Sequence, residues 1–445
     1  MKNNLLLIII FIIIIPAGLF SADTGQVTDI RHKGLSQTSR FTVDYFLMNS
    51  IGSPYSEELW QEEKNALMDL DIFADVELQK NKSAEGTILT YSYRELPPFI
   101  VFPAMKRTDQ DGLLMGPGIT FINLFGTGIH QEFLCRVTVV PEVLRARELL
   151  SYTRIPDVYG LMFDTEVTIN YFRSYNALKL FDENSFYSQA EFKYRLKKYY
   201  RIIGSLTSLN TKHDRDSKIF SADGEAMNMY AGTGEWDYIP GAGIGFAVDT
   251  RERIMNPHKG IYNEVKFTQY GDKLGGDGDY SEYTYDFRGY IPIGLHHIIH
   301  LNMLGRYRPG TIPAYELYHA GGVNSLRTFE PDPDICGQHE LLATAEYRYE
   351  LFANRQITVF DMNGYYGLQF VCGVDNALEW LPDESFENGR YYNSLYAGVH
   401  LLVPVLERVR LEFGINSPDM DEKSVKFGIN IGWYEKAYTQ RRRAR

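Results

Sequence analysis

An alternation of polar and apolar residues, repeated in short windows from about residue 99 to residue 433, constrains the fold of this chain more than any other feature. Phe427 and Ile429 fall on one face of the last window, and Gly428 and Asn430 fall on the other. Successive side chains of a β-strand point to opposite faces of its sheet, so a period of two predicts strands. Most of the chain is therefore expected to be β-structure.

The polar face of most windows carries charged residues, and the apolar face carries aromatic residues. Tyr283 and Tyr285, for example, alternate with Glu282 and Asp286. A barrel with lipid outside and a polar lumen inside needs this arrangement, whereas a large soluble β-sandwich needs an apolar interior. The 32 Tyr and 26 Phe residues also favour a pleated, partly exposed sheet. We predict a transmembrane antiparallel β-barrel over residues 98–435.

The number of windows predicts the number of strands in this barrel. They fall near 99–108, 112–124, 127–140, 143–154, 161–172, 186–197, 200–210, 241–250, 261–270, 279–291, 296–307, 340–351, 364–373, 394–403, 408–415 and 424–433. Sixteen is an even number, which allows the first and last strands of a closed barrel to meet as antiparallel neighbours. The predicted fold is therefore mainly β, with a 16-stranded barrel.

Composition and motifs exclude several classes of function. The formal net charge of −12 argues against a nucleic-acid partner, because such binding requires a basic surface. Cys135, Cys336 and Cys372 are widely spaced and form no CxxC pair, so no metal or redox site is predicted. The chain contains no GxSxG, P-loop or dinucleotide-binding motif. We predict no catalytic, cofactor-binding or metal-binding residues, and no enzyme.

The two ends of the chain differ from the rest. Lys2 precedes an apolar run from Leu5 to Ile15, and the small residues Ser21 and Ala22 follow. This run is shorter than the roughly 20 residues of a spanning helix, and the arrangement is typical of a signal peptide. We expect residues 1–22 to direct export, which leaves a soluble periplasmic protein or an outer-membrane barrel. At the other end, residues 436–445 form a basic extension.

Residues 26–97 show strand and helix patterns in the order β-α-α-β-β. A helical stretch carries Phe41, Tyr45 and Met48 at spacings of four and three. This small α/β segment resembles a polypeptide-transport-associated (POTRA) domain. The likeness rests on residues 67–76, with the sequence Leu-Met-Asp-Leu-Asp-Ile-Phe-Ala-Asp-Val. The resemblance implies that an extended client binds by adding a strand to a sheet edge. A spacer that holds the barrel away from other parts is the alternative.

Four motifs in the barrel region resemble the bacterial surface antigen family, the BamA/TamA-type barrels. They are Asn123-Leu124-Phe125-Gly126-Thr127-Gly128; Asp249-Thr250-Arg251 followed by Asn256-Pro257-His258-Lys259-Gly260; Gly321 to Phe329; and Glu346-Tyr347-Arg348. With the POTRA segment, the likeness covers almost all of the expected mature chain. It implies an outer-membrane barrel with one POTRA domain in the periplasm.

The third motif resembles the lid loop of this family, which folds back into the lumen. Its residues are Gly321, Gly322, Ser325, Leu326, Arg327 and Phe329. The resemblance implies that Arg327 enters the lumen, with Glu346 as its main partner, because an unpaired charge there is costly. Thr328 replaces the expected Gly, and Cys372 falls where a carboxylate is expected. The lid is therefore expected to be held by fewer charges, unless Asp375 substitutes through a bulge.

The first and last strands of the barrel must meet at a seam, and their residues predict weak pairing there. Pro103 has no N–H to donate, and Gly428 and Gly432 weaken the last strand. The family resemblance implies a lateral gate at this seam, where a client strand pairs with an exposed edge. The last strand also resembles the signal by which barrels are recognised for assembly. The residues of this signal are Lys426, Gly428, Ile431 and Trp433.

Together, these features predict an outer-membrane protein that assists insertion, assembly or translocation of proteins through a lateral seam. The predicted partners are outer-membrane lipid, an unfolded or extended client at the POTRA edge or the seam, and accessory periplasmic proteins. A single POTRA domain favours a specialised role over a general one. A passive channel or structural barrel, and a dedicated secretion pore for one partner, remain as alternatives.

Overall fold

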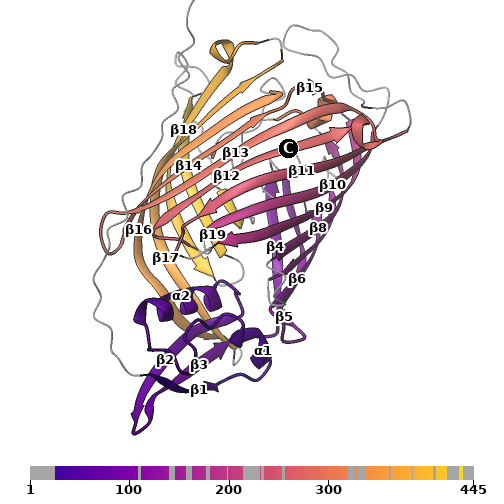
Figure 1. Ribbon diagram of the computed structural model, residues 1–445. Coiled ribbons are helices and arrows are strands. Elements are labelled where there is room, and N and C mark those ends of the chain that lie inside the picture. The colour runs from indigo at the N-terminus through magenta and orange to yellow at the C-terminus, as the bar shows by residue number, and fades with distance from the viewer. Residues whose placement is uncertain are drawn as a thin grey trace, which may run out of the picture.

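The computed structural model describes residues 26–108, 112–139, 146–156, 163–176, 181–197, 199–213, 231, 235–252, 256–318, 326–327, 337–359, 362–382, 384–403, 407–417 and 430–433. The expected signal peptide (1–22) and basic extension (436–445) lie outside the described residues. A small α/β unit, here called the N-terminal unit, lies against one end of a large barrel (Figure 1). We call this end of the barrel the near end and the opposite end the far end.

The N-terminal unit has the β-α-α-β-β order predicted from the sequence. It consists of β1 (Val27–Lys33), α1 (Arg40–Asp44), α2 (Glu57–Met68), β2 (Phe73–Ser83) and β3 (Gly86–Glu95). The central strand is β3, which pairs with β1 in parallel and with β2 antiparallel. The hydroxyl of Ser56 caps α2 by accepting a hydrogen bond from the Leu59 N–H at 3.3 Å. No helix in the described part of the chain is long and apolar enough to cross a membrane.

The first helix differs from its sequence pattern. It spans five residues, so it ends before the apolar spacing that continues to Met48. Val43 and Phe46 are buried in the core of the N-terminal unit, whereas Phe41 and Met48 are exposed. The apolar stripe is therefore an outer surface of this unit and not part of its core.

The predicted 16-stranded antiparallel barrel is confirmed. Its strands are β4 (Phe99–Thr108), β5 (Gly112–Leu124), β6 (Ile129–Thr138), β7 (Arg147–Ile155), β8 (Phe163–Asn176), β9 (Phe181–Lys197), β10 (Tyr200–His213), β11 (Trp236–Asp249), β12 (Gly260–Gly271), β13 (Asp279–Pro292), β14 (His297–Tyr307), β16 (His339–Val359), β17 (Met362–Trp380), β18 (Arg390–Val403), β19 (Glu407–Ser417) and β20 (Asn430–Trp433). The ring closes where β20 lies next to β4. A further two-residue strand, β15 (Gly310–Thr311), pairs with β13.

The short 3-10 helices of the barrel lie in connections at the far end. They are η1 (Asp272–Leu274), η2 (Ala314–Glu316) and η3 (Phe386–Asn388). The connection between β15 and β16, which contains the predicted lid motif, also starts at the far end. We call it the far-end connection. Within it the structure describes residues 312–318, 326–327 and 337–338.

The two faces of the barrel wall have the polarity that the alternation predicts. On β12, Val265 is exposed on the outer face, whereas its neighbours Glu264 and Lys266 are buried on the inner face. The Lys266 Nζ atom lies 2.8 Å from an oxygen of Glu191, which belongs to β9. Opposite charges thus compensate one another across the lumen, as buried charges require.

The N-terminal unit is joined to the barrel by the turn between β5 and β6. The N–H of Ser39 donates a hydrogen bond to the Gly126 carbonyl at 2.9 Å, and the Asn123 amide donates to the Thr38 hydroxyl at 2.8 Å. Gly126 has a φ of +73°, and an added Cβ there would lie 2.5 Å from the Gln37 carbonyl. The turn therefore requires glycine both for its backbone angle and for the close approach of the two units.

Candidate functional site

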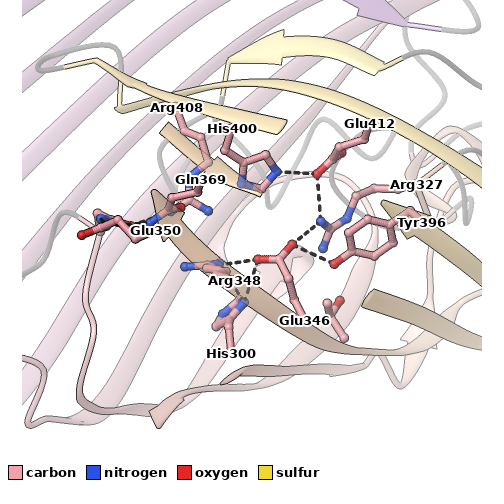
Figure 2. Close-up of polar contacts among 12 residues, drawn as sticks. His300, Arg327, Glu346, Arg348, Glu350, Gln369, Tyr396, His400, Arg408 and Glu412 are labelled. Carbon is pink, nitrogen blue, oxygen red and sulfur yellow. Dashed lines mark hydrogen bonds and ion pairs between the residues drawn. The ribbon is translucent and has the colours of Figure 1, made fainter. Parts of the chain in front are cut away.

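Arg327 is buried inside the barrel and forms ion pairs with three strands (Figure 2). Its Nη1 atom lies 2.7 Å from Glu346 on β16 and 3.0 Å from Glu412 on β19. Its Nε atom lies 3.1 Å from Asp375 on β17, and its backbone N–H donates to the same carboxylate at 3.1 Å. One residue of the far-end connection thus holds together three strands of the barrel wall.

Uncharged side chains complete the contacts of this connection. The Arg327 guanidinium lies 3.8 Å from the ring centroid of Tyr396 on β18, and the hydroxyl of that tyrosine donates to Glu346 at 2.8 Å. The preceding residue, Leu326, is fully buried against Leu342, Ala377 and other apolar side chains of the wall. Because the contact combines apolar packing with ion pairs, the connection is anchored by more than one charge pair.

Glu346 is a partner of Arg327, as expected, but the expectation that the lid would be held by fewer charges is wrong. Asp375 and Glu412 are also partners, so Arg327 has three carboxylates around it. Cys372 is exposed on the outer face, and Asp375, three residues further along β17, lies on the inner face. The ladder between β16 and β17 has no irregularity at these residues, so no bulge is needed to bring Asp375 inward.

Further polar side chains surround the same carboxylates. Arg348 and His300 contact Glu346 from one side, and the His400 ring lies 2.8 Å from Glu412 on the other. Figure 2 shows these residues converging on the space between β14, β16, β18 and β19. The Arg327 site is therefore part of a larger charged network on the lumenal face of the C-terminal strands.

One group of residues in the described part of the chain has the composition of a metal site. A ligand atom of each of Glu346, His400 and Glu412 lies within 4.8 Å of the others. The Arg327 guanidinium already lies between the two carboxylates and supplies the positive charge that they need. We therefore assign no metal ion to this group.

A second contact reaches the same strands from the near end. It comes from the turn between β11 and β12, where the Asn256 amide donates to Glu350 on β16 at 3.1 Å. Gln369 on β17 and Arg408 next to the start of β19 each donate to the Asn256 oxygen at 3.1 Å. The motif at 249–260 was recognised in the sequence only by its resemblance to the bacterial surface antigen family. Its contact across the lumen had no sequence signal, because the partners lie 94 to 152 residues away.

The seam between β4 and β20 differs from this wall. Pro103 on β4 is directly opposite Pro117 on β5, in a ladder that the structure describes without a register shift. The part of β20 that the structure describes spans four residues and pairs with β19 from Glu412 to Val409. Gly432, Ile431 and Trp433, which were named in the sequence, belong to this short stretch.

Several of the residues named from the sequence lie outside the described part of the chain. They are Gly321, Gly322, Ser325, Thr328 and Phe329 of the lid motif, and Lys426 and Gly428 of the last strand. Their roles stay predictions. Leu326, Arg327 and Glu346 are the lid residues that the structure brings together.

The fold and the anchored far-end connection are those of an outer-membrane barrel. Comparison with known families shows to which family this chain belongs. Residues 123–433 match the Omp85 superfamily domain, so the chain belongs to the Omp85 superfamily. Barrels of this superfamily are outer-membrane proteins. The family resemblance predicted from the motifs is thereby confirmed.

Solved structures of BamA and CdiB are among those similar to this chain. BamA from Haemophilus ducreyi, lacking POTRA domains 1–3, is 15% identical with a TM-score of 0.55, covering 91% of this chain and 83% of that one. CdiB from Acinetobacter baumannii is 13% identical with a TM-score of 0.59, covering 91% and 72%. CdiB from Escherichia coli is 12% identical with a TM-score of 0.62, covering 91% and 75%. At these identities the likeness establishes the fold, and no curated protein sequence matches the chain.

Proposed function

We propose that this protein assists the insertion, assembly or translocation of other proteins at the outer membrane, and that a client strand enters at the seam between β20 and β4. The near end then faces the periplasm, where the N-terminal unit acts as a POTRA domain. The observation that carries the proposal is the position of Pro103 opposite Pro117.

The two prolines indicate which edge of β4 lacks a donor. Opposite residues in an antiparallel ladder either exchange both of their hydrogen bonds or exchange none. Neither proline has an N–H, so the pair fits a position that exchanges none. The nitrogen of Pro103 then faces β20, and the edge of β4 that closes the barrel has one donor fewer.

The strands next to the seam on one side are held from within the lumen. Arg327 contacts β16, β17 and β19 from the far-end connection, and Asn256 contacts β16 and β17 from the near end. Separation of β16, β17 and β19 requires the loss of buried ion pairs, which is costly. Opening between β20 and β4 requires neither loss, which supports the seam as the moving part.

The N-terminal unit offers a second place for a client. In the described part of this unit, β3 is the central strand, and β1 and β2 each pair with it on one side. The other side of β1 or β2 presents backbone groups to which an extended segment can add as a further strand. A client that first pairs with this edge would be delivered to the near end of the barrel.

Contacts at the far end favour this role over that of a passive channel. Tyr315 and Leu317 of the far-end connection pack against Leu209, Ile239 and Tyr280 on β10, β11 and β13. The Tyr315 hydroxyl also donates to Asp237 at 2.9 Å. A chain segment that packs inside the wall narrows the lumen. A passive diffusion pore, in contrast, requires an open lumen.

Deletion of the gene in its host, followed by quantitative comparison of outer-membrane and secreted proteins, tests the proposal. The proposal predicts that a small set of proteins is lost from these fractions and is restored by the wild-type gene. Purified protein in liposomes should show little solute-driven swelling. Unchanged protein fractions combined with rapid swelling would favour a passive channel, and the loss of one secreted protein alone would favour a dedicated secretion pore.

A further inference from the structure

Two arginines lie side by side on the outer face of the barrel, at its far end. Arg147 begins β7, Arg173 lies near the end of β8, and the ladder between these strands places the two residues directly opposite each other. Both side chains are exposed. Directly opposite residues have Cβ atoms about 4.5–5.5 Å apart, and like charges at that distance destabilise the strand pair. We call Arg147 and Arg173 the outer arginine pair.

The outer arginine pair differs from the arginine on the inner face of the same part of the wall. Arg136 on β6 and Glu148 on β7 are both buried on the lumenal side, where they form an ion pair of 2.7 Å. Within the residues that the structure describes, no side-chain hydrogen bond or ion pair involves Arg147 or Arg173. The wall thus neutralises its lumenal arginine locally, whereas the two outer charges lack a carboxylate among the described residues.

The outer arginine pair belongs to a row of residues that crosses neighbouring strands at one level. The register places Asn184 on β9 opposite Arg173, and Lys212 on β10 opposite Asn184. Trp236 on β11 is opposite Lys212 and is exposed. Lys212 has its own partner, because its Nζ atom lies 2.8 Å from an oxygen of Glu235. The two arginines are therefore the members of this row whose positive charge is available to an outside anion.

The outer arginine pair lies at the level where lipid headgroups begin. The next outward-facing row toward the near end is uncharged, with Leu149 and Phe186 exposed and Tyr171 between them in the register. On β8, Arg173 is ten residues beyond Phe163, which is exposed at the near end. Ten residues span about 33 Å along a strand. At a tilt of about 40° this is about 25 Å along the membrane normal, which is the height of the apolar band of a transmembrane barrel.

We infer that the outer arginine pair binds the phosphate group of an anionic membrane lipid in the leaflet at the far end. A guanidinium group donates several N–H bonds in a fixed planar arrangement that matches the oxygens of a phosphate. One phosphate between Arg147 and Arg173 accepts from both and offsets their repulsion, and the acyl chains of the lipid lie along the uncharged row. The inference requires a membrane around the barrel and does not depend on any client.

Lipid binding to the purified, folded full chain tests this inference. The protein is kept in a neutral detergent, phosphatidylglycerol or phosphatidylcholine is titrated, and native mass spectrometry counts the bound lipid molecules. Arg147→Gln combined with Arg173→Gln removes the outer arginine pair. Lys212→Gln combined with Lys273→Gln is the matched control, because it removes the same charge from the far end, from two lysines that each have a carboxylate partner. A change in gel mobility on boiling shows that each protein is folded.

We expect the wild type to bind one phosphatidylglycerol about tenfold more tightly than phosphatidylcholine. The arginine variant should lose this preference, and the lysine variant should keep it within about twofold. Equal weakening in both variants would overturn the inference, because it would show attraction to the net charge and not to one site. A wild type without the preference would also overturn it. Displacement of phosphatidylglycerol by an equal concentration of inorganic phosphate would show a site for the free anion and would exclude the lipid as the partner.

Discussion

The wall formed by β16 to β19 and the seam formed by β20 and β4 are parts of one barrel, but they are held by different interactions. β16 and β17 span 21 and 19 residues, and Arg327 and Asn256 contact them from opposite ends of the lumen. β4 spans 10 residues and contains Pro103, which has no N–H to donate. We therefore expect the free energy that holds neighbouring strands together to be larger in the wall than at the seam.

Removing Arg327 should weaken the wall most. Arg327→Ala leaves Glu346, Asp375 and Glu412 buried without their shared cation, which should lower barrel stability by about 3–5 kcal/mol. Glu346→Gln should cost less, because two carboxylates still hold the arginine. Samples are incubated at a series of temperatures and run on a gel without boiling. The measured quantity is the temperature at which the band of the folded form disappears.

Arg288→Ala is the matched control for this change. Arg288 is also a lumenal arginine, and it pairs with Asp286 on its own strand. A loss equal to that of Arg327→Ala would mean that any lumenal arginine contributes as much, and the wall would have no special anchor.

The junction with the N-terminal unit should show the next largest effect. Gly126→Ala imposes an unfavourable φ, at about 1–2 kcal/mol, and adds a Cβ atom too close to the Gln37 carbonyl. Gly52→Ala is the control, since Gly52 has a φ of +86° with no atom within 4 Å of an added Cβ. Hydrogen exchange of residues 36–42 should rise clearly more in the first variant. Equal exchange in both would show that the close approach is unimportant.

The near-end contact of the wall should contribute less than Arg327. Asn256→Gly keeps a residue that accepts the φ of +44° but removes the amide that contacts Glu350, Gln369 and Arg408. We expect a loss of about 1–2 kcal/mol, because the remaining partners can still bond to one another. Unfolding in urea after reconstitution measures it. An unchanged midpoint would remove Asn256 from the account of the wall.

A pH-dependent effect of smaller size is expected at Glu95. Burial alone would raise the pKa of Glu95, but hydrogen bonds from Ser36 and Thr38 outweigh burial and lower it. A lowered pKa stabilises the folded state above the ordinary pKa of Glu, and this stabilisation is lost as the pH falls through the lowered value. Glu95→Gln should therefore cost about 1 kcal/mol at pH 7.

The same variant should match the wild type in acid, where the wild-type carboxylate is protonated. Hydrogen exchange of residues 36–38 at a series of pH values follows the difference. A difference that persists unchanged at low pH would show that the charge of Glu95 is not what holds this segment.

The barrel could be predicted from the sequence because its main constraint is local. Each strand must alternate between lipid and lumen, so the period of two is written into every window. The same parity could have identified Asp375, since it shares a face with Gln369 and Val371, and Cys372 does not. Matching a family motif position by position led instead to Cys372. Parity was the better guide inside a strand.

Contacts between distant segments could not be predicted in this way. Nothing near Asn256 indicates that its amide meets Glu350 and Arg408, because the closure of the barrel brings them together. The stripe of Phe41 and Met48 had the correct helical spacing but the wrong environment. A periodic apolar face indicates a buried face only when another protein surface covers it, and here the structure leaves Phe41 and Met48 exposed.

The seam itself can be tested most directly by locking it. Val101→Cys on β4 is combined with Ile429→Cys or Ile431→Cys on the last strand, in a protein without native cysteines. Leu395→Cys with Ile415→Cys, directly opposite each other on β18 and β19, locks the wall as a control. The account predicts that oxidation of the seam pair abolishes delivery of the proteins lost in the deletion strain, that reduction restores it, and that the wall pair has no effect. Normal delivery with a fully oxidised seam would contradict it.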